Sequence, residues 1–139
     1  MPDLNGSRTH QNLMAVFVRE SQNTLRYLWF AQLADIDGQP DIAALFRSVA
    51  DGEIGHVHAT LEHLVDLGDP MTGEPIGDTE QNLRAAIVGE SHDASESYPK
   101  FADAARAEGH DAIAEWFDAL ARAEDGQLER LRAGLDALG

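Results

Sequence analysis

The feature that most constrains the fold of this 139-residue chain is an internal duplication. The segment TEQNLRAAIVGES at 79–91 matches THQNLMAVFVRES at 9–21 with an offset of 70 residues. From Tyr27 onward the offset is 71, which pairs Tyr27 with Tyr98, Phe30 with Phe101, Gly38 with Gly109, Phe46 with Phe117 and Glu53 with Glu124. One structural unit therefore occurs twice, and each copy must bury its apolar face against another unit.

Each unit is predicted to be a helical hairpin, because apolar residues recur at helical spacing and glycine or proline interrupts them at regular points. We predict helices at 9–36, 40–66, 79–107 and 110–138, with a capping box in which Asp78 or Thr79 and Gln81 begin the third. The chain is then a single all-α domain of residues 1–139. Its two repeated hairpins, 9–66 and 79–138, pack as a ferritin-like four-helix bundle and are joined by the linker 67–78.

The linker is short for a connection that must run back along the full length of one bundle. Fully extended, about eleven residues reach ~35 Å at ~3.3 Å per residue, whereas a helix of 27 residues is ~40 Å long at ~1.5 Å per residue. Exchange of hairpins between two chains relieves this constraint, so a domain-swapped homodimer is one predicted assembly.

The change of offset means that one extra residue has entered between Glu90 and Tyr98. A continuous helix accommodates one additional residue most easily as a π-bulge, which occurs frequently at functional sites. We predict such a bulge within 91–98.

A glutamate lies on the apolar face of every predicted helix. These residues are Glu20, Glu53, Glu90 and Glu124, and positions three residues further along add His56, Asp93 and Gln127 to the same faces. Five unpaired carboxylates inside a bundle would cost several kcal/mol each. Two divalent cations would offset most of that charge, and glutamates with acid-x-x-His pairs are the pattern by which helical bundles hold two transition-metal ions.

The composition argues against several kinds of partner and of chemistry. The 25 acidic and 10 basic side chains give a net charge of −15, which opposes binding to nucleic acid and to anionic membranes. No cysteine occurs, so the chain has no thiolate nucleophile and no sulfur ligand for iron. The first residues do not read as a signal peptide, and we expect a cytoplasmic protein.

The motifs FAxxAxxxG at 30–38, IAxLFxxxAxxExxH at 42–56 and YPxFAxxAxxEG at 98–109 resemble the rubrerythrin family, over nearly the whole chain. The chain looks like a short form without the cysteine-rich rubredoxin domain. The resemblance implies a ferritin-like bundle with a non-haem di-iron centre, reduction of hydrogen peroxide with electrons from an external donor such as rubredoxin, and a homodimer. It carries the family's iron ligands over to Glu20, Glu53, His56, Glu90 and Glu124, and it makes Tyr27 and Tyr98 the tyrosines that hydrogen-bond the ligating carboxylates.

Two positions depart from the family pattern. Asp93 stands where the pattern has a glutamate, which shortens the carboxylate arm by one methylene, and Gln127 stands where it has a histidine. The resemblance makes His56 and Asp93 the positions that exchange at one iron as its oxidation state changes. An amide oxygen is a weaker, neutral ligand than imidazole, so one metal position should be weakened. A further hypothesis is that His92 supplies the imidazole that is absent at position 127.

Three uses of the fold stay open. The first is the family's peroxide reduction. The second is ferroxidase activity with dioxygen as oxidant, metal storage, or a mixed or single-metal centre. Such a centre would be filled by iron or by another divalent transition metal, chiefly through Glu20, Glu53 and His56. The third is a bundle that no longer turns over and serves as an interaction protein.

Overall fold

The computed structural model describes residues 2–139, which are helical apart from the N-terminal segment, the linker and the turns. The elements are α1 (Arg8–Ile36), α2 (Pro40–Leu64), a short 3-10 helix η1 (Val65–Leu67), α3 (Thr79–His92), a π-helical segment η2 (Asp93–Ser97), α4 (Tyr98–Ala107) and α5 (Asp111–Ala137). They form two compact units, Met1–Pro70 and Met71–Gly139. The prediction of an all-α chain built from two repeated helical hairpins is confirmed, and the pairing of the hairpins within one chain or by exchange stays a prediction.

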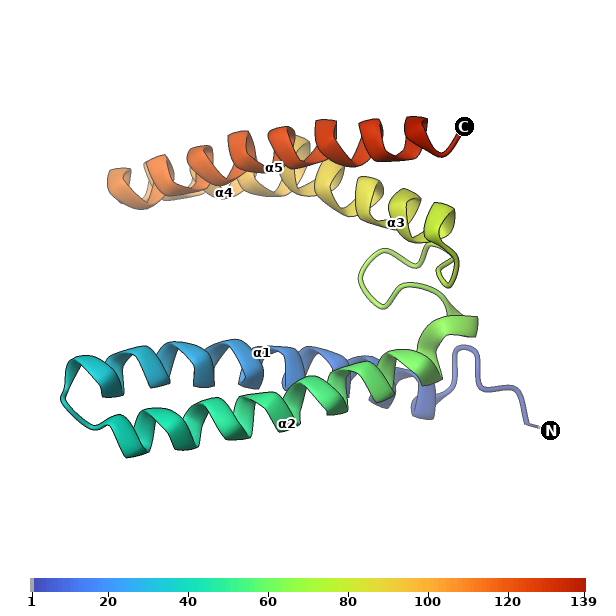
Figure 1. Cartoon of the computed structure of the whole chain (residues 1–139). Helices are drawn as coiled ribbons and strands as arrows, with labels where there is room; N and C mark the ends of the chain where they lie inside the picture. The colour runs from blue at the N-terminus through green and yellow to red at the C-terminus, as the bar shows by residue number, and fades with distance from the viewer. Residues whose placement is uncertain (1) are drawn as a thin grey trace. The chain divides into compact units, whose positions relative to one another are not determined.

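In the first unit, α1 and α2 run antiparallel and side by side (Figure 1). Ser7 begins α1 by accepting a hydrogen bond from the His10 backbone N–H at 3.0 Å. Gly38 takes a positive φ of 75° after the end of α1, and Pro40 opens α2, where its missing N–H costs no hydrogen bond. Near the turn, the core between the two helices contains the small side chains Ala31, Ala34 and Ala43, which let the helices approach closely, and Phe46 packs against them.

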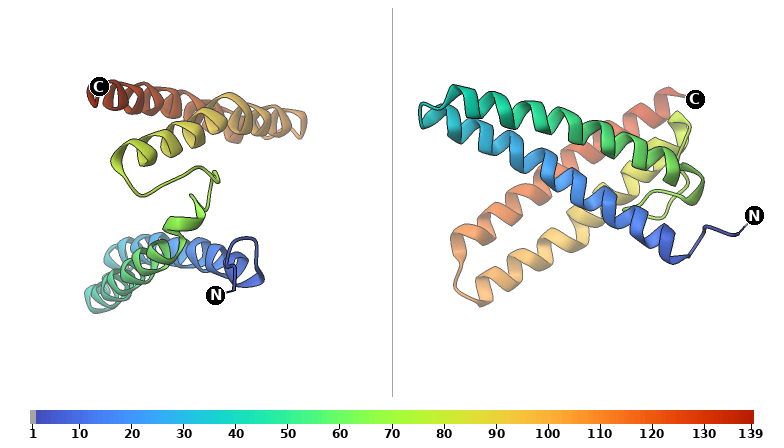
Figure 2. Two further views of the ribbon diagram at one scale, coloured as in Figure 1. Left: turned by 90° about the vertical axis from the view of Figure 1, so that its right-hand side faces the viewer. Right: turned by 90° about the horizontal axis from the view of Figure 1, so that it is seen from below.

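In the second unit, α3, η2 and α4 follow one another along α5 (Figure 2). Asp78 and Gln81 form the predicted capping box at the start of α3, with the Gln81 backbone N–H donating to Asp78 Oδ1 at 2.8 Å. Gly109, at a φ of 83°, makes the turn into α5.

An ion pair supports the duplication independently. Asp35 pairs with Arg47 in the first hairpin, and Arg106 pairs with Asp118 at the corresponding positions of the second. The charges are reversed, but the same two positions are bridged. Both copies therefore hold their two helices in the same register near the turn.

The predicted π-bulge is confirmed at Asp93–Ser97, where the Tyr98 backbone N–H donates to the Asp93 carbonyl oxygen five residues earlier. Because the extra residue is absorbed there, α4 returns to the register of the first copy. Asp93 thus stands at the first position of the only π-helical segment within residues 2–139.

No helix in the described part of the chain is long and apolar enough to cross a membrane.

Candidate metal centre

The first hairpin brings three predicted ligands together. Glu20 of α1 and Glu53 and His56 of α2 each place a ligand atom within 4.8 Å of the others. His56 Nδ1 lies 3.3 Å from Glu53 Oε2 and 3.8 Å from Glu20 Oε2. It is the one group of three or more histidine, aspartate or glutamate side chains within residues 2–139 that meets this spacing.

The two carboxylates of this cluster are largely buried, which makes their negative charge costly. The Glu20 and Glu53 side chains are 23% and 15% exposed, whereas the His56 side chain is 65% exposed. Glu20 Oε2 is buried and has no hydrogen-bond partner, the one side-chain atom in that condition in the described residues. A buried acceptor without a partner costs about 1–3 kcal/mol, and a charged one costs more. The first hairpin therefore presents a buried carboxylate oxygen that lacks a hydrogen-bond donor.

Two buried threonines, Thr24 and Thr60, follow the ligands by one helical turn. The Thr24 hydroxyl donates to the Glu20 carbonyl oxygen at 2.8 Å, and the Thr60 hydroxyl donates to the His56 carbonyl oxygen at 2.7 Å. Both hydroxyl groups therefore donate their proton to a backbone carbonyl oxygen and not to a ligand side chain. Thr60 was not predicted from the sequence, although its spacing of four residues from His56 was a signal that could have identified it.

The second hairpin places Gln127 against Glu90. With the amide oriented so that its nitrogen faces the carboxylate, Gln127 donates to the two Glu90 oxygens at 3.2 and 3.3 Å. Gln127 corresponds to His56 in the duplication, and Glu90 corresponds to Glu20. Gln127 thus gives Glu90 a hydrogen-bond donor, whereas Oε2 of the corresponding residue Glu20 has none.

Arg130 and Leu131 line the same open pocket as Glu90 and Gln127. Arg130 was not predicted as a site residue, although its spacing of three residues from Gln127 was a signal that could have identified it. A guanidinium in this pocket adds a positive group near the second hairpin's carboxylate.

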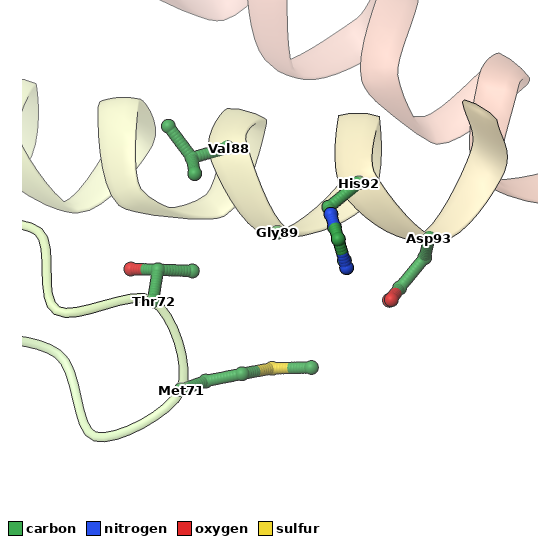
Figure 3. A pocket seen from close by; sticks show the side chains of 6 residues that line it. All are labelled: Met71, Thr72, Val88, Gly89, His92 and Asp93. Atoms are coloured by element: carbon green, nitrogen blue, oxygen red, sulfur yellow. The ribbon is translucent and has the colours of Figure 1, made fainter. Parts of the chain in front are cut away.

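Asp93 and His92 lie in a different pocket from Gln127. They line it together with Met71 and Thr72 of the linker and Val88 and Gly89 of α3, and Figure 3 shows both side chains extending toward the linker side. His92 Nδ1 also lies 3.0 Å from Glu96 Oε2. The imidazole of His92 is therefore engaged away from the pocket in which Gln127 stands.

Glu124 is partly buried on α5. Within residues 2–139, Glu90, Asp93 and Glu124 do not come close enough together to form a three-ligand group like that of the first hairpin. The predicted ligands are thus brought together as a group of three in one unit and as the pair Glu90–Gln127 in the other.

The two tyrosines occupy equivalent places. Tyr27 lies against Phe30 and Phe46 with ring centroids 6.3 and 6.1 Å apart, and Tyr98 lies 6.1 Å from Phe101. Within its own hairpin, as far as the structure describes it, neither hydroxyl donates a hydrogen bond to a predicted ligand. Their predicted role beside the ligating carboxylates stays a prediction.

The sequence of this chain matches a known protein family. The family model described as Rubrerythrin matches residues 11–135. The chain belongs to the rubrerythrin family. It is 37% identical to the rubrerythrin of Nitratidesulfovibrio vulgaris over 134 residues, which are 94% of this chain and 70% of that protein. It is 34% identical to the rubrerythrin of Porphyromonas gingivalis over 125 residues, which are 87% of this chain and 62% of that protein.

Membership in the rubrerythrin family confirms the resemblance drawn from the motifs. A third relative, nigerythrin of Nitratidesulfovibrio vulgaris, is 28% identical over 130 residues, or 90% of this chain and 64% of that protein. The chain thus spans between 62% and 70% of the length of these three relatives. Within this member of the family the two hairpins are unequal, because the first presents two carboxylates and an imidazole and the second pairs a carboxylate with an amide.

Proposed function

We propose that this rubrerythrin-family protein binds iron at a carboxylate-rich centre and reduces hydrogen peroxide to water with electrons from a separate donor. The unpartnered oxygen of Glu20 carries the proposal. It lies beside Glu53 and His56, it is buried, and nothing within residues 2–139 donates a hydrogen bond to it.

The side chains of the first hairpin fit iron. Imidazole nitrogen and carboxylate oxygen are both common iron donors, whereas a site for calcium or magnesium would use oxygen alone. The exposed ring of His56 keeps a nitrogen accessible to an ion that reaches the cluster from solvent. Two carboxylates and one neutral imidazole then compensate the two charges of a ferrous ion.

Glu90, Glu124 and Asp93 of the second hairpin would complete a centre for two ions, with Gln127 as a weak or indirect ligand. The five carboxylates carry five negative charges, and two ferrous ions carry four positive charges, so the charges nearly balance. In this assignment Glu53 and Glu124, which correspond in the duplication, would each supply a carboxylate ligand to the centre.

Reduction of one hydrogen peroxide molecule to two water molecules consumes two electrons and two protons. Two ferrous ions, when bound, supply those two electrons, one from each ion. These 139 residues contain no cysteine with which to hold an electron-relaying cluster, and a separate donor such as rubredoxin is proposed to restore the electrons. Tyr27 and Tyr98 are proposed to hold the ligating carboxylates in position through their hydroxyl groups.

Rapid mixing of the reduced, iron-loaded protein with peroxide or with dioxygen tests the oxidant. We expect peroxide to oxidise the protein at least about tenfold faster at equal concentration, which corresponds to a barrier lower by about 1.4 kcal/mol. Faster oxidation by dioxygen would reject peroxide reduction and favour a ferroxidase. The matched control is protein loaded with zinc, which has no accessible second oxidation state and should give no signal.

The hydrogen bond from Gln127 to Glu90 favours a second candidate, a centre in which the first hairpin holds one ion tightly and the second position fills poorly. In that case the protein would serve as an iron-binding protein or ferroxidase. The contrast between Glu20 without a partner and Glu90 with one is the observation that supports it.

Gln127→His is expected to raise the iron content from between one and two ions per chain to about two, because imidazole is a stronger iron ligand than an amide. Elemental analysis of protein made in iron-replete cells measures this. His56→Gln is the matched control and should lower the content. Equal occupancy of about two in the wild type and in Gln127→His would show that the amide does not weaken a position.

A further inference from the structure

The two hairpins differ in what surrounds one glutamate in each. In the second hairpin, Glu90 lines an open pocket between α3 and α5 together with Gln127, Arg130 and two apolar residues. The duplication pairs Glu90 with Glu20, Gln127 with His56 and Arg130 with Ala59. The same place in the fold therefore carries an imidazole and a methyl group in one copy, and an amide and a guanidinium group in the other.

The pocket of the second hairpin is lined by one anion and one cation. Among the residues that line it, Glu90 is the only carboxylate and Arg130 is the only basic side chain. Arg84 and Arg106 of the same hairpin form ion pairs, whereas Arg130 forms none within residues 2–139. No other carboxylate therefore holds the Arg130 side chain, and Glu90 is the anion that shares its pocket.

Gln127 and Arg130 offer Glu90 the two things that a bound cation would offer, which are a partner for its oxygens and positive charge. The Gln127 amide donates to both Glu90 oxygens, at 3.2 and 3.3 Å. Arg130 adds a permanent positive charge with five N–H donors. Opposite charges inside a protein attract over several ångströms, so the guanidinium group stabilises the negative charge of Glu90 from across the pocket.

The first hairpin offers Glu20 neither of these. Glu20 Oε2 is buried without a hydrogen-bond donor, and Ala59, which stands in the place of Arg130, has no polar side-chain atom. An ion that binds the first hairpin gives that oxygen the partner it lacks. An ion that binds the second hairpin must first displace the Gln127 amide from Glu90 and must approach the positive charge of Arg130.

We propose that Arg130, together with Gln127, neutralises Glu90 in the metal-free protein and thereby makes the two hairpins take up metal in a fixed order, the first before the second. Arg130 is a positioning residue, because it acts on the metal through Glu90. The inference rests on the proposed iron centre and deepens it, since it names the side chain that makes the two metal positions unequal.

Stability of the metal-free protein tests the pairing of Arg130 with Glu90. Arg130→Met should lower the melting temperature by about 3 °C or more, because it leaves a carboxylate without its cation. Arg132→Met removes the same charge from an exposed position of the same helix and is the matched control. In a Glu90→Gln background, Arg130→Met should cost no more than Arg132→Met. Equal effects of the two arginine variants in the wild-type background would overturn the pairing.

Calorimetric titration of the metal-free, full-length protein with zinc tests the order of uptake without any redox chemistry. We expect two binding steps of unequal affinity, of which Glu20→Gln removes the tighter and Glu90→Gln removes the weaker. Arg130→Met should tighten the weaker step at least about tenfold and leave the tighter step unchanged. Two equal steps in the wild type, or a weaker step that Arg130→Met leaves unchanged or weakens further, would overturn the proposal.

Transfer of the arginine to the first hairpin gives the reciprocal test. Ala59→Arg should weaken the tighter zinc step at least about tenfold, because it places a guanidinium group where Arg130 stands in the other copy. Ala59→Met, which adds length without charge, is the control and should leave that step within about threefold of the wild type. Equal behaviour of the two variants would show that charge at this position does not compete with the ion.

The same samples separate this inference from the proposed function. A protein that takes up two ions in the expected order but is not oxidised by peroxide supports the role of Arg130 and rejects peroxide reduction. A wild type that binds neither zinc nor ferrous iron rejects the iron centre and the order of uptake together. In that case the metal-free melting temperatures still decide whether Arg130 neutralises Glu90.

Discussion

Replacing Glu53 by glutamine is expected to weaken iron binding at least about 100-fold. Changing groups that only support a metal ligand already costs up to that factor, and Glu53 is one of the three side chains that converge in the first hairpin. The substitution keeps the size of the side chain and its ability to contact His56 but removes the charge. Iron per chain after equilibration with a chelator of known affinity measures the effect.

The same variant should have the opposite effect on the metal-free protein. Glu53 and Glu20 are both largely buried around His56, and two ionised carboxylates at close range repel one another. Glu53→Gln should therefore raise the melting temperature of the metal-free protein while it lowers that of the iron-loaded protein. Glu62→Gln, an exposed change of equal charge on the same helix, is the control and should do neither. A variant that changes both forms in the same direction would argue against a metal at this cluster.

Removing the metal is expected to lower the melting temperature by about 10 °C. A ligand present at 100 times its dissociation constant stabilises the native state by about 2.7 kcal/mol, and a chain of this size gains roughly 3–4 °C per kcal/mol. Buried carboxylates that lose their cation add to the loss. Calorimetry of the iron-loaded and the chelator-treated protein at neutral pH gives the difference.

Magnesium serves as the control for that measurement, since it screens surface charge but does not favour an imidazole-containing site. Re-addition of ferrous iron under anaerobic conditions should restore stability, and magnesium at the same concentration should not. If magnesium restores the melting temperature equally well, the stabilisation comes from general neutralisation of the acidic chain.

The helical hairpins could be predicted from the sequence because two independent signals agree. Glycine and proline mark the turns, as Gly38 with Pro40 and then Gly109 show in the structure, and the duplication requires the second half to repeat the first. The π-helical segment was predictable for a related reason. An offset that changes from 70 to 71 inside a helix leaves one residue to absorb, and Asp93–Ser97 absorbs it.

The ends of the helices were less predictable. α2 was expected to reach residue 66 but ends at Leu64, and Val65–Leu67 continue as a 3-10 turn. Apolar periodicity continues through Val65 and Leu67, so the pattern could not reveal that the hydrogen bonding tightens there.

Side-chain partners were the part that sequence reasoning could not supply. Gln127 was interpreted as a weakened ligand, but the hydrogen bond that it can donate to Glu90 depends on the separation between α3 and α5, which periodicity does not give. Likewise Asp93 shares a helix face with Glu90 by spacing, yet the π-helical turn that begins at Asp93 places it in a pocket with His92. Helix spacing predicts which residues share a face, whereas the contacts across that face depend on packing.

Anomalous X-ray diffraction at the iron edge, from crystals of the iron-loaded protein, tests whether Glu20, Glu53 and His56 hold an iron ion. We expect an anomalous peak within bonding distance of Glu20 Oε2, a Glu53 oxygen and a His56 nitrogen. Crystals of iron-replete protein in which those three side chains surround no iron, or in which Glu20 Oε2 has a hydrogen-bond donor in its place, would contradict it.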